Sequence, residues 1–223
     1  MQDMTDTTAD NLNLIHLVLG CDDRFAPFVA TTVRSIVEHT NNQILVSVIS
    51  DGITNLSKEK ILQSIPKDNL IIEFIDIDGD NIFDGFQASA DTTRATYCRF
   101  LIPKLWPNED KIIYSDVDVI FTDNIAKLYN EDLSSYVIAA MSDPFTYTHD
   151  AIPAVYKKLG IASNHKYFNA GVLLINCREW NRQTISEKNL RNRETPSRSF
   201  RFPRSRYFKY RIPKQLQGTP REI

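Results

Sequence analysis

The sequence predicts an α/β fold in which helices flank a mostly parallel central sheet. Apolar runs of strand length alternate with segments of helical spacing along the chain, a pattern typical of βαβ units. The chain has 223 residues and a hydrophobic fraction of 42%, which suffices for one sizeable core. Acidic pairs follow two of the apolar runs, and ligands of parallel sheets bind beyond the carboxyl ends of the strands.

Two strand and helix units open the pattern. Residues 14–19 form an apolar run that predicts a buried strand, and residues 26–38 follow with helical spacing. Residues 43–50 predict a second strand. Ser57 is expected to cap the next helix, which should end just before Pro66 because proline interrupts the helical hydrogen bonds.

The rest of the pattern continues the alternation. Four more strands are expected, at residues 70–75, 111–115, 137–141 and 167–176. Two more helices are expected, at residues 92–101 and 152–159. Pro103 is expected to end the first of these two helices. Strands joined through helices run parallel, so the sheet should be mostly parallel.

The formal net charge of −2 hides an uneven distribution of charge along the chain. Residues 191–223 hold 10 Lys and Arg but only 2 Asp and Glu. We therefore expect an acidic globular core over residues 13–185 and a basic, poorly ordered tail over residues 186–223. An acidic core argues against nucleic acid as a partner.

The cysteines and the apolar content indicate a cytoplasmic protein. Cys21, Cys98 and Cys177 are scattered and lack metal-type spacing, which argues against a disulfide framework and fits a reducing compartment. Residues 1–13 are polar and lack the apolar segment of a secretory signal. No apolar run approaches the roughly 20 residues that span a bilayer.

The run over residues 112–121 carries two carboxylates, Asp116 and Asp118, at the end of an apolar strand. Residues i and i+2 of a strand face the same side, so the two should project together while Val117 faces the opposite layer. Like charges this close are relieved by a divalent cation or a shared proton. The spacing therefore indicates a metal and a phosphorylated substrate, although an ordinary polar turn has the same pattern.

Three other places can carry chemistry, and each also has a structural interpretation. Asp22 and Asp23 follow the first strand, where they fit a turn or recognition of a polar ring edge, with Phe25 stacked on a flat base. Arg99 lies in an apolar helix and fits either a surface residue or a phosphate or carboxylate ligand. Asn169 precedes a buried strand and fits a turn or a contact to sugar hydroxyls.

Four stretches, taken together and in this order, carry a family resemblance. They are LGCDDRFAPF at residues 19–28, TYCRF at 96–100, IIYSDVDV at 112–119 and YFNAGVLLINCREW at 167–180. The chain resembles glycosyltransferase family 8 on these stretches, close to the bacterial lipopolysaccharide galactosyl- and glucosyltransferases. The resemblance implies a GT-A type nucleotide-binding fold, a UDP-linked donor such as UDP-galactose or UDP-glucose, Mn²⁺ or Mg²⁺, and transfer with retention to a saccharide acceptor.

The same resemblance implies roles for individual residues. Asp116 and Asp118 would bind the metal, Asp22 would contact the uracil, and Arg24 stands where relatives often have Asn. The full set of donor-binding residues that it implies is Asp22, Phe25, Arg99, Asp116, Val117, Asn169 and Ala170. No residue is assigned as the catalytic nucleophile or base.

The resemblance stops at Trp180. Family members continue with an Asp-Gln pair and then a His followed by Gly and Lys, and no His follows His165 in this chain. We therefore expect a core that is truncated or frameshifted after about residue 180, with impaired transfer. Alternatives are an inactive remnant whose basic run over residues 200–211 contacts anionic lipid at the inner membrane face, and a haloacid-dehalogenase-type phosphatase with Asp116 as nucleophile.

Overall fold

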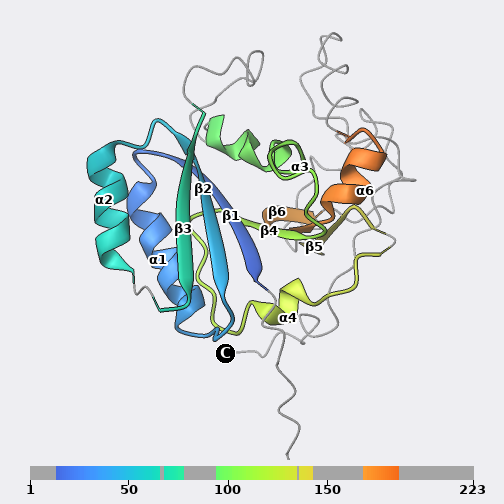
Figure 1. Ribbon diagram of the computed structural model, residues 1–223, viewed down its shortest axis with the longest axis horizontal. Coiled ribbons are helices and arrows are strands. Elements are labelled where there is room, and N and C mark those ends of the chain that lie inside the picture. The colour runs from blue at the N-terminus through green and yellow to red at the C-terminus, as the bar shows by residue number, and fades with distance from the viewer. Residues whose placement is uncertain (1–13, 66–67, 78–93, 135, 143–167, 186–223) are drawn as a thin grey trace, which may run out of the picture.

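The computed structural model describes residues 14–65, 68–77, 94–134, 136–142 and 168–185. Within these residues the chain forms a six-stranded sheet in the order β3-β2-β1-β4-β6-β5 (Figure 1). Strands β3, β2, β1 and β4 run parallel, whereas β6 is antiparallel to both β4 and β5. The predicted α/β class with a mostly parallel sheet is confirmed.

Each predicted strand is present, with small shifts at its ends. The strands are β1 (Ile15–Asp22), β2 (Ile44–Asp51), β3 (Leu70–Asp76), β4 (Ile112–Ser115), β5 (Ile138–Ser142) and β6 (Phe168–Ile175). The helices are α1 (Ala26–Val37), α2 (Asn55–Ser64), the 3₁₀ helix η2 (Arg94–Phe100), α3 (Ile102–Leu105), α4 (Ala126–Tyr129) and α6 (Cys177–Arg182). None of these helices is both long and apolar enough to cross a bilayer.

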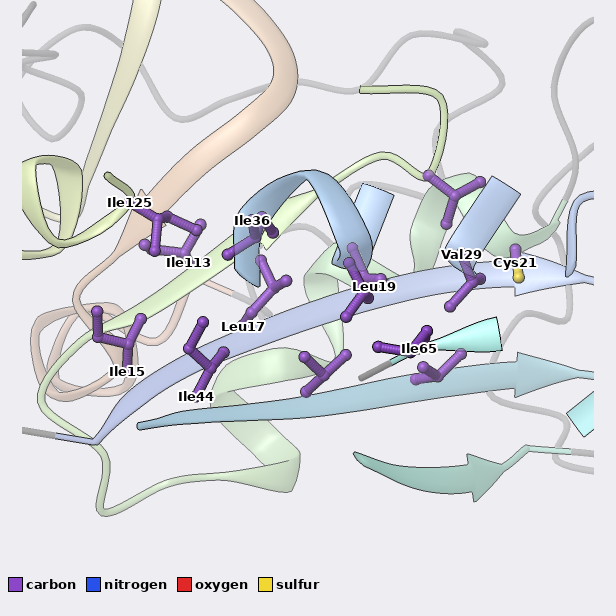
Figure 2. Close-up of a cluster of buried hydrophobic side chains, with 14 of the residues drawn as sticks. Ile15, Leu17, Leu19, Cys21, Val29, Ile36, Ile44, Ile65, Ile113 and Ile125 are labelled. Atoms are coloured by element: carbon purple, nitrogen blue, oxygen red, sulfur yellow. The ribbon is translucent and has the colours of Figure 1, made fainter. Parts of the chain in front are cut away.

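Helices cover both faces of the sheet because successive strand residues point to opposite sides. Leu17 and Leu19 of β1 pack with α1 in one buried cluster. Figure 2 shows both leucines close to Ile36 of α1. Val18, between them, packs in a second cluster with Cys98 of η2 and with residues of α3 and α6. The helices α1 and α2 therefore cover one face, and η2, α3 and α6 cover the other (Figure 1).

Two predictions about helices are wrong in detail. The helix expected over residues 92–101 is a 3₁₀ helix, and Pro103 lies in the first turn of α3, where a missing N–H breaks no helical hydrogen bond. The N-cap of α2 is Thr54, not Ser57, because the Thr54 hydroxyl accepts a hydrogen bond of 3.2 Å from the backbone N–H of Ser57. The helix expected over residues 152–159 and the tail over 186–223 lie outside the described residues.

Candidate functional site

The two acidic stretches of the sequence lie at the same edge of the sheet. Strands β1 and β4 are parallel neighbours, and Leu19 pairs with Ser115 (Figure 1). Asp22 ends β1 and Asp116 directly follows β4. Both therefore stand at the carboxyl ends of adjacent parallel strands, where sheets of this class bind ligands.

The paired aspartates do not lie in the strand. Strand β4 ends at Ser115, and a turn that contains Val117 and Asp118 follows Asp116, so alternation along a strand is not what orients them. Val117 is buried in the core as expected, and its carbonyl accepts a 2.5 Å hydrogen bond from the Thr32 hydroxyl. Burial raises the pKa of Asp116, and the nearby charge of Asp118 raises it further.

One carboxylate oxygen of Asp116 is held by two donors. The Arg99 guanidinium donates to Asp116 Oδ1 at 2.9 Å, and the Tyr114 hydroxyl donates to the same oxygen at 2.6 Å. The backbone N–H of Asp116 donates to the carbonyl of Gly171 at 2.7 Å. Burial raises the pKa of Tyr114 well above its usual value, so its hydroxyl stays protonated as a donor.

Arg99 is buried rather than on the surface. Its side chain is only 10% exposed, and its Cζ lies 4.6 Å from the centre of the Tyr114 ring. The guanidinium also donates to the carbonyls of Thr96, at 2.8 Å, and Ala170. Arg99 thus joins η2 and β6 to Asp116, and the interpretation as a carboxylate partner is the correct one.

Strand β6 lies beside Asp116 through its antiparallel pairing with β4, and it bulges relative to β5 in the same region. Ala140 of β5 pairs with Leu173, but Met141 pairs with Asn169, so the ladder skips the residues between them. The Asn169 side-chain oxygen accepts a 2.7 Å hydrogen bond from the N–H of Gly171. A Cβ on Gly171 would lie 2.9 Å from that oxygen and 3.1 Å from Asp116 Oδ2. Glycine therefore leaves open the space next to this carboxylate oxygen.

The residues present fit a hard divalent cation, which prefers oxygen ligands. No described residue donates a hydrogen bond to Asp116 Oδ2, and the Asp116 side chain is 34% exposed. In the described part of the chain, no group of three or more His, Cys, Asp and Glu side chains is arranged to hold a metal. Asp116 and Asp118 would thus supply part of a coordination shell, and substrate phosphates could complete it.

The loop after β1 is organised by its own aspartates. Asp22 Oδ1 accepts hydrogen bonds from the N–H groups of Arg24 (3.0 Å) and Phe25 (3.3 Å), and Oδ2 accepts one of 3.1 Å from the Arg24 guanidinium. Phe25 is 38% exposed. Asp23 Oδ1 accepts hydrogen bonds from the N–H (2.9 Å) and hydroxyl (3.0 Å) of Thr54, and this backbone contact is the main cause of its lowered pKa. Asp23 therefore ties the loop to α2.

The structure joins some of the expected residues directly and leaves others apart. Arg99, Asp116 and Ala170 share direct hydrogen bonds, whereas no described hydrogen bond or ion pair joins Asp22 or Phe25 to them. Sequence reasoning missed the roles of two residues, Tyr114 and Gly171. Tyr114 stands two positions before Asp116, and Gly171 is part of the FNAG stretch, so spacing could have pointed to both.

Comparison with known proteins places the chain in a family. A family model described as glycosyl transferase family 8 matches residues 16–203, which continues past Trp180. General stress protein A of Bacillus subtilis is 28% identical over 179 residues, and a putative glycosyltransferase of Haemophilus influenzae is 29% identical over 177 residues. These matches include 78% and 79% of this chain but 60% and 52% of those proteins, so the chain spans little more than half of their length.

A crystal structure of the galactosyltransferase LgtC, in complex with donor and acceptor sugar analogs, superposes with a TM-score of 0.69. The two chains are 26% identical, and the match covers 81% of this chain and 65% of that one. This likeness confirms the expected GT-A type of the fold. The family match over most of the chain, together with this fold, shows that the chain belongs to glycosyl transferase family 8.

Proposed function

We propose that the chain is a retaining hexosyltransferase that moves a sugar from UDP-galactose or UDP-glucose to a saccharide acceptor of the lipopolysaccharide or lipooligosaccharide type. The observation that carries the proposal is the arrangement around Asp116, whose Oδ2 is open while Arg99 and Tyr114 hold Oδ1. Asp116 directly follows β4, at the edge of the sheet where the parallel strands β1 and β4 end and where such sheets bind ligands. Family membership favours sugar transfer over the phosphatase alternative.

In this proposal Asp116 and Asp118 hold Mn²⁺, and Mg²⁺ is an alternative because both ions prefer oxygen ligands. When bound, the cation neutralises negative charge on the departing diphosphate. Gly171 supports the assignment, since a Cβ there would approach within 3.1 Å of Asp116 Oδ2. The phosphates of the donor supply further ligands.

The remaining site residues bind and orient the donor. Asp22 contacts the uracil and the exposed Phe25 ring stacks on it, so the base competes with the Arg24 guanidinium for Asp22. Asn169 and Ala170 border the sugar and phosphate region. Arg99 contributes by holding Asp116 and the Ala170 carbonyl, because its donors already point at protein acceptors.

The place of action is proposed from the cysteines and the basic run. All three cysteines are buried thiols outside any disulfide, which fits a reducing cytoplasmic compartment. Residues 200–211 combine Arg and Lys with aromatic side chains, a composition that favours peripheral contact with an anionic membrane surface. We therefore expect the enzyme to work at the inner face of the membrane, where a lipid-linked saccharide would meet it.

The substitution Asp118→Asn tests the proposed cation site. It removes an exposed carboxylate but keeps its shape, so we expect UDP affinity in the presence of Mn²⁺ to fall by more than about tenfold, while metal-free affinity is unchanged. Calorimetric titration with UDP measures the affinity. Release of UDP from UDP-galactose and from UDP-glucose, with and without Mn²⁺, identifies the sugar that is used.

Asp123→Asn is the matched control, because Asp123 is an exposed carboxylate nearby in the chain that pairs with Lys127 instead. Unchanged donor affinity in the Asp118 variant, or an equal loss in the Asp123 variant, would refute the metal assignment. Mn²⁺-dependent UDP binding without any sugar transfer would instead favour the inactive remnant.

A further inference from the structure

The two oxygens of the Asp116 carboxylate have different surroundings. Oδ1 accepts hydrogen bonds from both Arg99 and Tyr114, whereas Oδ2 accepts none from the described part of the chain. Oδ2 instead faces the space that Gly171 leaves open. A carboxylate whose first oxygen is held by two donors presents its second oxygen in a fixed direction.

Tyr114 has few other uses for its hydroxyl. The side chain is 1% exposed and lies in the cluster below η2, with Arg99 over its ring. Its ring therefore contributes to packing, while its hydroxyl makes one described hydrogen bond, of 2.6 Å, to Asp116. Burying a hydroxyl is unfavourable unless it gains a partner, so a phenylalanine would serve the core equally well. The hydroxyl must be explained by what it does to Asp116.

We propose that Tyr114 is a positioning residue. Together with Arg99 it holds Oδ1 of Asp116 in hydrogen bonds, so that Asp116 binds the cation through Oδ2 only. The inference rests on the proposed function, because it assumes that Asp116 is a metal ligand. A carboxylate that binds through one oxygen suits small octahedral ions, whereas Ca²⁺ also accepts carboxylates through both oxygens. Tyr114 therefore helps the site to prefer Mn²⁺ over Ca²⁺.

The test is Tyr114→Phe, which keeps the ring and its contact with Arg99 but removes the hydroxyl. With UDP present, we expect Mn²⁺ affinity to fall about tenfold, as is typical when a partner of a metal ligand is lost. Ca²⁺ should compete better against Mn²⁺ than in the wild type, because Asp116 is free to use both oxygens. Proton relaxation by bound Mn²⁺, titrated with Ca²⁺, measures both quantities without relying on turnover.

Tyr129→Phe is the control, since Tyr129 lies at the other end of β4, where its carbonyl accepts a hydrogen bond from Lys111. The Tyr129→Phe variant should bind Mn²⁺ and Ca²⁺ as the wild type does. If Mn²⁺ affinity and Ca²⁺ competition are unchanged in Tyr114→Phe while Asp118→Asn no longer binds Mn²⁺, the inference about Tyr114 is overturned but the proposed function is not. Failure of the wild type to bind Mn²⁺ would overturn both this inference and the proposed function.

A second measurement does not depend on how the variant folds. A structure of the wild-type chain with Mn²⁺ and UDP should show Asp116 bound to the metal through Oδ2, with both hydrogen bonds to Oδ1 retained. Coordination through Oδ1, or through both oxygens, would overturn the inference even if Tyr114→Phe proved unstable.

Discussion

Among single residues, His16 makes an unusual set of contacts in the core. It is 2% exposed, and its Nε2 lies 2.8 Å from the hydroxyl of Ser47, which itself donates to Glu73. Because that hydroxyl has one hydrogen to give, Nε2 must be the donor in its contact with His16. The other ring nitrogen has no hydrogen-bond partner in the described chain and lies 3.8 Å from a Glu109 oxygen. Burial lowers the pKa of His16 to about 4, although Glu73 acts to raise it.

The lowered pKa of His16 predicts a loss of stability in acid. The unfolded chain takes up the proton below the ordinary value of 6.5, but the folded chain does so only near 4. Between these values the unfolded state binds more protons, so the free energy of unfolding decreases as the pH falls. By about pH 5 the decrease is about 2 kcal/mol, and urea unfolding at about pH 7 and pH 5 measures it.

His16→Gln should remove most of this pH dependence, because glutamine does not titrate. His39→Gln, at an exposed position, should leave it as in the wild type. Equal slopes in the His16 variant and the wild type would show that another group controls acid stability.

Residue types and short motifs were enough to select several candidate residues of the site. Asp116, Asp118 and Asn169 could be singled out because oxygen-bearing side chains at the ends of strands can bind a cation or sugar hydroxyls, although each position also fits a turn. Arg99 could not be placed from its own segment, since only the fold shows that Asp116 and Ala170 meet it. Contacts between segments so far apart in the chain depend on the register of β4 with β6, which local spacing does not encode.

Among the elements, η2 approaches the sheet closely at Gly20 of β1. A Cβ on Gly20 of β1 would lie 2.7 Å from the Cβ of Cys98 and 3.3 Å from the carbonyl oxygen of Ala95. Glycine is thus required here for the close approach of the 3₁₀ helix, and not for a turn. Cys98 directly precedes Arg99, so this contact lies next to the residue whose guanidinium binds Asp116.

We predict that Gly20→Ala displaces η2 and weakens the site together with the fold. Overpacking of this kind destabilises a core by roughly 1–3 kcal/mol, and movement of Arg99 should lower Mn²⁺-dependent UDP affinity as well. Urea unfolding and UDP titration measure the two effects. Cys98→Gly in the same chain should restore part of both, and strictly additive effects of the two substitutions would contradict the steric explanation.

The pattern of elements predicted the sheet better than it predicted the helix types. Apolar runs bounded by turn residues marked every described strand, and burial on both faces demands such runs in the central strands β1 and β4. The 3₁₀ form of η2 escaped notice, since helices of three and of 3.6 residues per turn share much of their hydrophobic spacing. The bulge in β6 also escaped, because it exists only relative to β5.

At the scale of the whole molecule, the charge asymmetry predicts salt-dependent attachment to membranes. Each Lys or Arg near an anionic surface contributes about 1 kcal/mol. We expect the full chain to sediment with phosphatidylserine vesicles at low salt and to be released at high salt. A variant with five substitutions by Gln should lose most of this binding: Arg201, Arg204, Arg206, Lys209 and Arg211.

The control variant replaces Arg34 and Lys127, two exposed residues outside the basic run, by Gln. This variant should still bind the vesicles. Equal retention of the chain with five substitutions would exclude the basic run as the lipid contact. Binding to neutral vesicles of phosphatidylcholine would argue for an apolar contact instead of an electrostatic one.

The position of β6 between β4 and β5 has a consequence for biosynthesis. During translation, the residues of η2 and β4 emerge long before the strand that completes their surroundings. A nascent chain that has not reached Gly171 lacks both the backbone acceptor for Asp116 and the Ala170 carbonyl for Arg99. Among the described strands, the last to be synthesised is therefore the one that completes the surroundings of Asp116, and binding of the proposed metal ion would report that β6 has paired with β4.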